Sequence, residues 1–248
     1  MSEKSREPTR SNLLKGRHVL ITGAAGAIGS AIAQSMTNHG ARVTRTDRVA
    51  GEGLLLLDAC QEASVRHGFE VAGAITDVVH AAGTLIMGPI AMTDAADFRT
   101  AVDSNLTSAY LIGREAAQRL ERGASLTFIS SQASYRAAAN WGVYCAVKAG
   151  VSRLSEALAQ ELGPRGIRVN AVCPGIVSSP MIEDVCRQAA RLNGKTPEAV
   201  LVGYKANIPM GRLADPREIG DVCVFLASPL SSYVSGASIP VDGGEVSA

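Results

Sequence analysis

Tyr144 and Lys148 are the residues of this sequence whose spacing most directly suggests proton-transfer chemistry. On a helix, residues four apart share one face, with their Cβ atoms about 6 Å apart. A free tyrosine, with a pKa of about 10, is a weak base at neutral pH, but a neighbouring cation stabilises the phenolate and lowers that pKa. The pair therefore predicts that Tyr144 acts as a general acid or base and that Lys148 lowers its pKa.

Ser131 is a third polar residue that the sequence places near this pair. It follows the apolar run Ser125–Ser130, which is typical of a buried strand. Ligand crevices in α/β sheets open at the carboxyl ends of strands, so the Ser131 hydroxyl is expected to bind the reacting oxygen. A tyrosine and a lysine four apart also occur by chance as an exposed pair worth about 0.2–0.5 kcal/mol. The serine, combined with a glycine-rich turn earlier in the chain and with Pro174-Gly175 after a following strand, argues against that alternative.

A glycine-rich turn joins the first apolar run, His18–Thr22, to a helical pattern that extends from Ile28 to His39. Glycines let the backbone approach a pyrophosphate, and the N–H groups and dipole at the start of a helix favour bound phosphate. A tight turn without a ligand is the alternative, but it needs fewer glycines. The residues expected to contact a dinucleotide here are Gly23, Ala25, Gly26, Ala27, Ile28 and Gly29.

Asp47 bears on the choice between NAD and NADP. It stands at the end of the second predicted strand, beyond the glycine turn. A carboxylate at this place accepts hydrogen bonds from the adenosine ribose and repels a 2′-phosphate. Arg45 and Arg48 supply positive charge nearby, and Arg48 is included among the expected cofactor contacts, whereas Ala25 is neutral. NAD is therefore predicted in preference to NADP.

Asp58 stands at the corresponding place after the third predicted strand, Leu54–Leu57. Its functional interpretation is a contact with the adenine edge, made together with Ala59. The alternative is a polar strand end that binds nothing, and the sequence leaves both open.

Apolar runs and helical patterns alternate along the chain, which is typical of βαβ units and predicts an α/β protein with a parallel sheet. The predicted strands are His18–Thr22, Ala41–Thr46, Leu54–Leu57, Asp77–His80, Ser125–Ser130, Ile167–Val172 and Ile239–Val241. The predicted helices are Ile28–His39, Ala59–Phe69, Asp94–Arg122, Tyr144–Leu162 and Asp215–Ala227. Short helical segments with a looser pattern fill residues 180–210, which we interpret as a mobile substrate lid.

The composition limits the class of protein. A hydrophobic content of 46% with only 4% aromatic residues suits a sheet that helices cover on both faces. The formal net charge is +1 and the basic residues are scattered, which argues against nucleic acid or a membrane surface as a partner. The five cysteines have no metal-ligand spacing with the four histidines, so no metal is expected and a reducing compartment is indicated.

Residues 1–12 are polar and charged and lack the apolar core of a signal peptide, so they are expected to be a flexible extension. Residues 13–248 are expected to form one domain. No apolar run approaches the roughly 20 residues needed to span a bilayer. A cytoplasmic protein is therefore predicted.

Taken together, these motifs resemble those of the short-chain dehydrogenase/reductase family, in its compact single-domain form, over about residues 16–244. The resemblance implies a Rossmann-like, doubly wound parallel sheet of about seven strands with helices on both faces, usually assembled as a homotetramer, with a homodimer as the alternative. The motifs that carry it are Thr22–Gly29, Asn105 in Asp103–Thr107, Ser131, Tyr144 with Lys148, Arg168–Asn170 before Pro174–Gly175, and Val241–Gly244.

The resemblance also implies roles for individual residues. Tyr144 exchanges a proton with the substrate, Ser131 positions the substrate, Lys148 also binds the nicotinamide ribose, and Asn105 anchors a water in a proton relay. The backbone of Val177 would contact the nicotinamide carboxamide, and Ser179 stands where the family usually has threonine. The remaining expected cofactor contacts are Ala81, Ala82, Gly83, Pro174 and Gly175.

One motif departs from the family pattern. Where relatives read Asn-Asn-Ala-Gly after the fourth strand, this chain reads His80-Ala81-Ala82-Gly83, so His80 must supply the hydrogen bonds of an asparagine or they are lost. We interpret His80 as structural. The stretch between Asp47 and Val79 is also short for the family.

The leading functional hypothesis is a nicotinamide-dependent oxidoreductase that transfers a hydride between its cofactor and a secondary alcohol or ketone. An NADP-dependent 3-oxoacyl-thioester reductase is an alternative within the same family. A catalytically silent protein that senses a dinucleotide is an alternative of another class. The substrate itself is left open, because its specificity resides in residues 180–210 and in the loop that carries Trp141.

Overall fold

The computed structural model describes residues 12–246, which form a seven-stranded sheet in the order β3-β2-β1-β4-β5-β6-β7 with every neighbouring pair parallel. The predicted doubly wound parallel sheet is thereby confirmed. The predicted extension, residues 1–12, lies outside the described residues except for its last position. The strands are β1 His18–Thr22, β2 Arg42–Asp47, β3 Leu55–Leu56, β4 Asp77–His80, β5 Ser125–Ile129, β6 Arg168–Pro174 and β7 Ser238–Val241.

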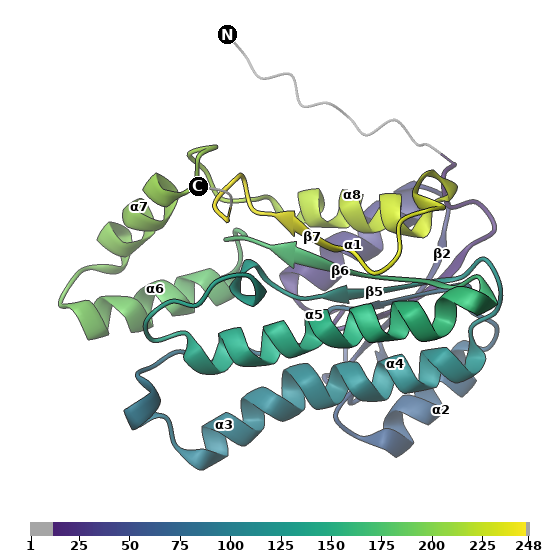
Figure 1. Cartoon of the computed structure of the whole chain (residues 1–248), viewed down its shortest axis with the longest axis horizontal. Coiled ribbons are helices and arrows are strands. Elements are labelled where there is room, and N and C mark those ends of the chain that lie inside the picture. The colour runs from purple at the N-terminus through teal and green to yellow at the C-terminus, as the bar shows by residue number, and fades with distance from the viewer. Residues whose placement is uncertain (1–11, 247–248) are drawn as a thin grey trace, which may run out of the picture.

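Helices cover both faces of the sheet (Figure 1). Helices α1 and α8 pack together on one face, and α2, α4 and α5 lie on the other, while α6 and α7 pack on each other at one end of the molecule. The helices are α1 Ala27–Asn38, α2 Glu62–Ala72, α3 Ala95–Val102, α4 Ser108–Arg119, α5 Gly142–Leu162, α6 Pro180–Asn193, α7 Pro197–Asn207 and α8 Pro216–Ala227.

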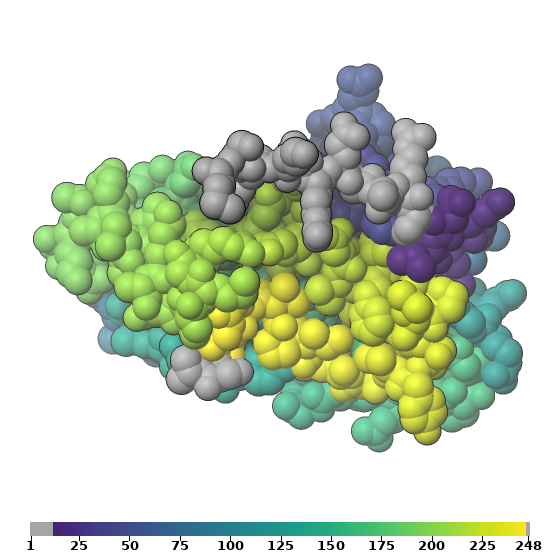
Figure 2. Space-filling model, turned by 90° about the horizontal axis from the view of Figure 1, so that it is seen from above, coloured from purple at the N-terminus to yellow at the C-terminus, as the bar shows by residue number. Residues whose placement is uncertain are grey.

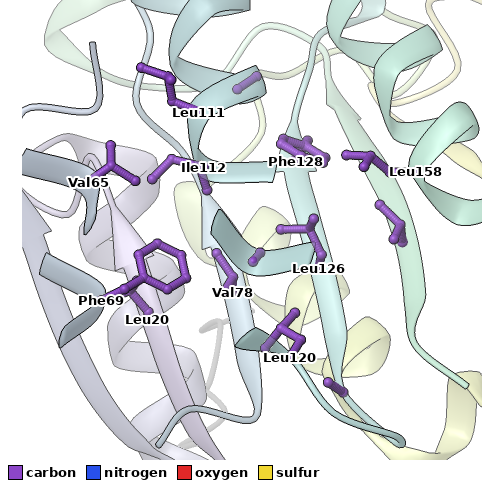
Figure 3. Packing of buried hydrophobic residues seen from close by; sticks show 14 of the residues in the cluster. Leu20, Val65, Phe69, Val78, Leu111, Ile112, Leu120, Leu126, Phe128 and Leu158 are labelled. Atoms are coloured by element: carbon purple, nitrogen blue, oxygen red, sulfur yellow. The ribbon is translucent and has the colours of Figure 1, made fainter. Parts of the chain in front are cut away.

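Two apolar cores, one on each face, hold the layers together. Figure 3 shows the core beneath α2, α4 and α5, where Phe69, Ile112 and Phe128 are buried against the strands. On the opposite face Met36 of α1 and Ile219 of α8 are fully buried. Burying a side chain of this size stabilises the fold by about 1.5–3 kcal/mol. Helices on both sides explain why strands such as β1, with five buried residues, read as unbroken apolar runs.

The order of the strands places the ligand crevice. β1 lies between β2 and β4, so the connections after β1 and after β4 leave in opposite directions across the sheet. In doubly wound sheets such a switch point opens a crevice at the carboxyl ends of the strands. The glycine turn after β1 and the residues after β4, β5 and β6 all lie at that edge.

The predicted single helix over residues 94–122 is instead interrupted. A π turn, Asp103–Thr107, separates α3 from α4, and Asn105 lies at its centre. A π turn inserts one residue without ending the helix, and such turns occur often at functional sites. The apolar periodicity on either side remains helical, so the sequence pattern did not reveal the interruption.

The C-terminal segment returns to the same edge of the sheet. The N–H of Met210 donates to the backbone oxygen of Gly243 at 3.2 Å, which joins the chain after α7 to the turn after β7. Figure 2 shows the green atoms of this region beside the yellow atoms of the C-terminal strand. The residues that follow β7 therefore lie close to the segment predicted to be a substrate lid.

Candidate active site

Tyr144, Ser131 and Lys148 meet at one cavity of about 290 Å³ at the carboxyl edge of the sheet. Ser131 is the second residue after β5, and its Oγ accepts the N–H of Ala133 at 3.1 Å. Tyr144 lies in the first turn of α5, and Lys148 lies one turn further on with only 5% of its surface exposed. Lys148 Nζ is 5.7 Å from the centroid of the Tyr144 ring and donates to the backbone oxygen of Ile129 at 3.0 Å.

The electrostatics of this pair differ from the sequence-based expectation. Desolvation raises the pKa of Tyr144 to about 12, although a hydrogen bond with the Ser131 hydroxyl acts in the opposite direction. Desolvation also lowers the pKa of Lys148 to about 8. In the protein without bound ligands the pKa of Tyr144 thus lies above its usual value, because removing the phenol from water disfavours the phenolate. The role of Lys148 in lowering this pKa stays a prediction.

Asn105 reaches the same cavity from the π turn. Its Nδ2 donates to the backbone oxygens of Thr84 and Ala101, both at 2.9 Å. Its Oδ1 is buried and has no hydrogen-bond partner among residues 12–246. A Cβ at Gly83 would stand 2.6 Å from this oxygen and 3.3 Å from Lys148 Nζ, so only glycine fits between them. An unpartnered buried acceptor in a polar site fits a bound water.

The glycine turn has the shape that a dinucleotide pyrophosphate requires. Gly23 adopts φ +70°, and a Cβ there would lie 2.6 Å from the Ala82 nitrogen. Helix α1 begins after Gly26 without a side-chain cap and without an acidic residue in its first turn. Its N-terminal N–H groups and dipole are thus free to bind an anion. These residues fit the pyrophosphate of a nicotinamide dinucleotide.

Asp47, the last residue of β2, is hydrogen-bonded to the glycine turn. Its Oδ2 accepts the N–H of Ala25 at 3.0 Å, and its Oδ1 accepts the N–H of Val49 at 3.3 Å. The guanidinium of Arg45 instead donates to the backbone oxygen of Glu52 at 2.9 Å. Arg48 is exposed. The carboxylate is therefore the charged group in contact with the turn.

Asp58 shapes the chain after β3. Its Oδ1 accepts the N–H of Cys60 at 2.9 Å, and its own N–H donates to Ser64 Oγ at 2.9 Å, so the residue organises the approach to α2. Ala59 is buried beside it. Neither lines the cavity that contains Tyr144, and their contact with an adenine stays a prediction.

His80, the residue that departs from the family pattern, is a structural residue at the end of β4. It is 2% exposed and lies outside the cavity lining. Its Nδ1 is 2.7 Å from Thr22 Oγ1 and its Nε2 is 3.1 Å from Ser108 Oγ, which ties β1 and β4 to the start of α4. Burial lowers the pKa of His80 to about 3, so the ring is neutral near pH 7.

The loop after β6 completes the cavity wall. Gly175 fits there because a Cβ would lie 2.7 Å from the Cα of Asp242. Val177 is buried, and the hydroxyl of Ser179 donates to its backbone oxygen at 3.2 Å. The expected contacts that line the cavity are Ile28, Ala81, Gly83, Asn105, Ser131, Tyr144, Lys148, Pro174, Gly175, Val177 and Ser179.

The cavity also contains residues that the sequence interpretation either left open or missed. Trp141 lines it, whereas the Tyr135 hydroxyl bonds to the backbone oxygen of Ser238 instead. The residues from 180–210 that line it are Met181, Ile182, Val185, Tyr204 and Asn207. The lining residues that the sequence interpretation missed include Gln132, Arg136 and Glu245. Glu245 follows the last strand closely, so the rule that parallel strands end at one edge could have identified it.

Comparisons with known proteins agree with this fold. The profile of a family described as "Enoyl-(Acyl carrier protein) reductase" matches residues 23–245. Oxidoreductase UcpA of Escherichia coli K12 is 33% identical over 93% of this chain and 95% of its own length. L-xylulose reductase of Bos taurus is 31% identical over 93% of this chain and 97% of its own length. Ligand-free aldohexose dehydrogenase of Thermoplasma acidophilum has a TM-score of 0.86 at 26% identity, covering 96% of this chain and 97% of that one.

The chain therefore belongs to the short-chain dehydrogenase/reductase family, and it is a nicotinamide-dependent oxidoreductase. The reaction in the family profile's description and the sugars in the relatives' names belong to those proteins. Within residues 12–246, no helix is long and apolar enough to cross a membrane.

Proposed function

We propose that this protein is an NAD-dependent dehydrogenase that interconverts a secondary alcohol and the corresponding ketone. The observation that carries the proposal is that Tyr144, Ser131 and Lys148 meet in one cavity at the carboxyl edge of the sheet. When bound, the nicotinamide supplies the hydride acceptor or donor. The relatives whose names describe a reductase of xylulose and a dehydrogenase of aldohexose support a reaction between carbinol and carbonyl.

The side chains of this chain then handle the proton. During alcohol oxidation Tyr144 Oη accepts the proton of the substrate hydroxyl, and during ketone reduction it returns that proton to the carbonyl oxygen. The Ser131 hydroxyl binds the same oxygen and orients it. Lys148 and a water on Asn105 Oδ1 connect the phenol to solvent, which gives the unpartnered Oδ1 a hydrogen bond.

The preference for NAD rests on Asp47. Its carboxylate contacts the glycine turn at Ala25, and Arg45 points to the loop at Glu52. A 2′-phosphate at this place would meet a negative charge, whereas ribose hydroxyls can donate to it. These contacts support NAD over NADP.

The two competing functions make different predictions. A 3-oxoacyl-thioester reductase would use NADPH and turn over a thioester, and a dinucleotide sensor would bind NAD without turnover. The test is a panel of secondary alcohols, diols, hydroxy acids and a 3-oxoacyl thioester with each cofactor, followed by absorbance of the reduced nicotinamide. NAD-linked oxidation of an alcohol supports the proposal, and thioester reduction restricted to NADPH contradicts it.

We also propose a homotetramer, or a homodimer, in the cytoplasm. The free cysteines Cys60, Cys145, Cys173, Cys186 and Cys223 suit a reducing compartment. Phe98 on α3 and Tyr110 on α4 are 48% and 51% exposed and are available for contact between subunits. Light scattering during size-exclusion chromatography tests the assembly, and a monomer at working concentration would contradict it.

A further inference from the structure

A group of polar side chains, which we call the polar wall, forms one part of the cavity and has no role in the proton transfer described above. It consists of Gln132, Arg136 and Glu245. The lining of the cavity also includes large apolar side chains, among them Trp141, Met181 and Ile182. The polar wall therefore requires a separate explanation.

Glu245 is a buried acidic residue held in a fixed turn. It is 7% exposed, and its Oε2 accepts the side-chain N–H of Gln132 at 3.0 Å. Asp242 holds the turn, because its Oδ1 accepts the N–H of Gly244 at 3.0 Å and its Oδ2 accepts the N–H of Val246 at 2.8 Å. A carboxylate that is largely removed from water needs hydrogen-bond donors.

Gln132 provides a second acceptor that lacks a donor. Its Oε1 is buried and has no hydrogen-bond partner among residues 12–246. The atom lies beside Gly175, where a Cβ would stand 3.2 Å from it. Leaving a buried acceptor unpaired is unfavourable, so a ligand that donates a hydrogen bond here is stabilised.

Arg136 adds donors to the wall without neutralising Glu245. Its Nη1 donates to the backbone oxygen of Glu245 at 3.4 Å, and within residues 12–246 the two side chains form no ion pair. The wall thus offers acceptors and donors close together. An ammonium only donates and a carboxylate only accepts, whereas a hydroxyl does both.

We propose that the substrate of the reaction proposed above is a polyhydroxylated alcohol or ketone, such as a sugar or polyol. A hydroxyl on the carbon next to the reacting carbinol binds the polar wall and donates to Glu245. Gln132 directly follows Ser131 in the chain, so the wall begins beside the group that binds the reacting oxygen. Apolar lining residues such as Trp141 pack against the C–H groups of the same molecule. This inference rests on the proposed function and adds the substrate class.

Matched alcohols test the inference by turnover. trans-Cyclohexane-1,2-diol is compared with cyclohexanol, and xylitol with 2-pentanol, through kcat/KM with NAD. We expect the hydroxylated member of each pair to be favoured about tenfold or more, because it pairs a buried charged acceptor. Glu245→Gln is expected to remove about tenfold of this preference and to change kcat/KM for the simple alcohol by less. Glu121→Gln makes the same change at an exposed glutamate outside the cavity lining, so it is the matched control and should keep the preference.

Binding provides a readout that does not depend on turnover. Trp141 is the only tryptophan of the chain and lines the cavity, so its fluorescence reports occupancy. Xylitol should change this fluorescence in the wild type and in Glu121→Gln, and much less in Glu245→Gln. Equal preference for diols and simple alcohols, with no Glu245-dependent signal, would overturn the inference and leave the dehydrogenase intact. A Glu245-dependent signal without any NAD-linked turnover would instead contradict the proposed function.

Discussion

The ammonium of Lys148 lies 5.7 Å from the centroid of the Tyr144 ring and is hydrogen-bonded to the backbone oxygen of Ile129. Lys148 is thereby held close to the phenol but is also removed from water. Burial lowers the pKa of Lys148 to about 8, and desolvation raises the pKa of Tyr144 to about 12. The Tyr144 phenol is therefore protonated near neutral pH. Alcohol oxidation and ketone reduction, which need different protonation states of Tyr144, should then depend on pH in different ways.

The rate of alcohol oxidation should rise with pH. Oxidation needs the Tyr144 phenolate, and a phenol with a pKa of about 12 is almost fully protonated near neutrality. Below that pKa each pH unit raises the phenolate fraction about tenfold, so kcat/KM for oxidation should increase from about pH 7 to about pH 9. Ketone reduction needs the phenol and should change little. A flat oxidation profile would contradict this account.

Lys148→Met should remove activity and yet leave the protein at least as stable near pH 7. A buried ammonium whose pKa falls from 10.5 to about 8 opposes folding below pH 8. Between these values the unfolded chain binds more protons than the folded one, so the stability of the wild type rises with pH. The stability advantage of the variant should therefore shrink from pH 8 to pH 10. Thermal unfolding of both proteins at several pH values measures this difference in stability. A wild type that is more stable than Lys148→Met at every pH would contradict the prediction.

The fold could be predicted from the sequence because its main signals are local. Runs such as His18–Thr22 are apolar throughout since helices cover both faces of the sheet. The third strand was predicted two residues too long, because β3 is an edge strand that pairs only Leu55 and Leu56 with β2. The π turn at Asn105 was missed because one inserted residue leaves the helical pattern intact on each side.

The candidate site could be predicted only in part. Tyr144, Ser131 and Lys148 occupy characteristic spacings, and the structure brings them together. Glu245 and Gln132 are distant in the chain and meet only because β5 and β7 end at the same edge. The pKa of Tyr144 also depends on how completely the surrounding elements exclude water, which no spacing reveals.

Asp47→Ala should shift the cofactor preference toward NADP. Removing the carboxylate removes repulsion of a 2′-phosphate, so the ratio of kcat/KM with NADP to that with NAD should rise about tenfold or more. Asp58→Asn is the matched control, because Asp58 is the carboxylate that follows the neighbouring strand and organises the approach to α2. If both variants keep the wild-type ratio, Asp47 does not select the ribose.

His80→Leu should destabilise the fold, since Thr22 and Ser108 each lose a hydrogen-bond partner. We expect a loss of about 2–4 kcal/mol in the free energy of unfolding at pH 7. The pKa of His80 is 6.5 in the unfolded chain and about 3 in the folded protein, so only the unfolded chain binds the proton between these values. The wild type therefore loses stability as the pH is lowered below 6.5, and His80→Leu should not show this part of the pH dependence. Urea unfolding measures both effects, with His67→Leu at an exposed position of α2 as control. Equal stability of the two variants would contradict the structural role.

The most direct test of the central claim is the turnover of Tyr144→Phe beside that of Tyr135→Phe, a tyrosine that does not line the cavity. Because Tyr144→Phe lacks the phenolic hydroxyl that transfers the proton, its kcat for NAD-linked alcohol oxidation should fall by about 10²–10⁴-fold. NAD binding should stay within about threefold, because the pyrophosphate and ribose contacts remain. Tyr135→Phe should retain wild-type turnover. Wild-type turnover in Tyr144→Phe would contradict the assignment of Tyr144 as the proton-transfer residue.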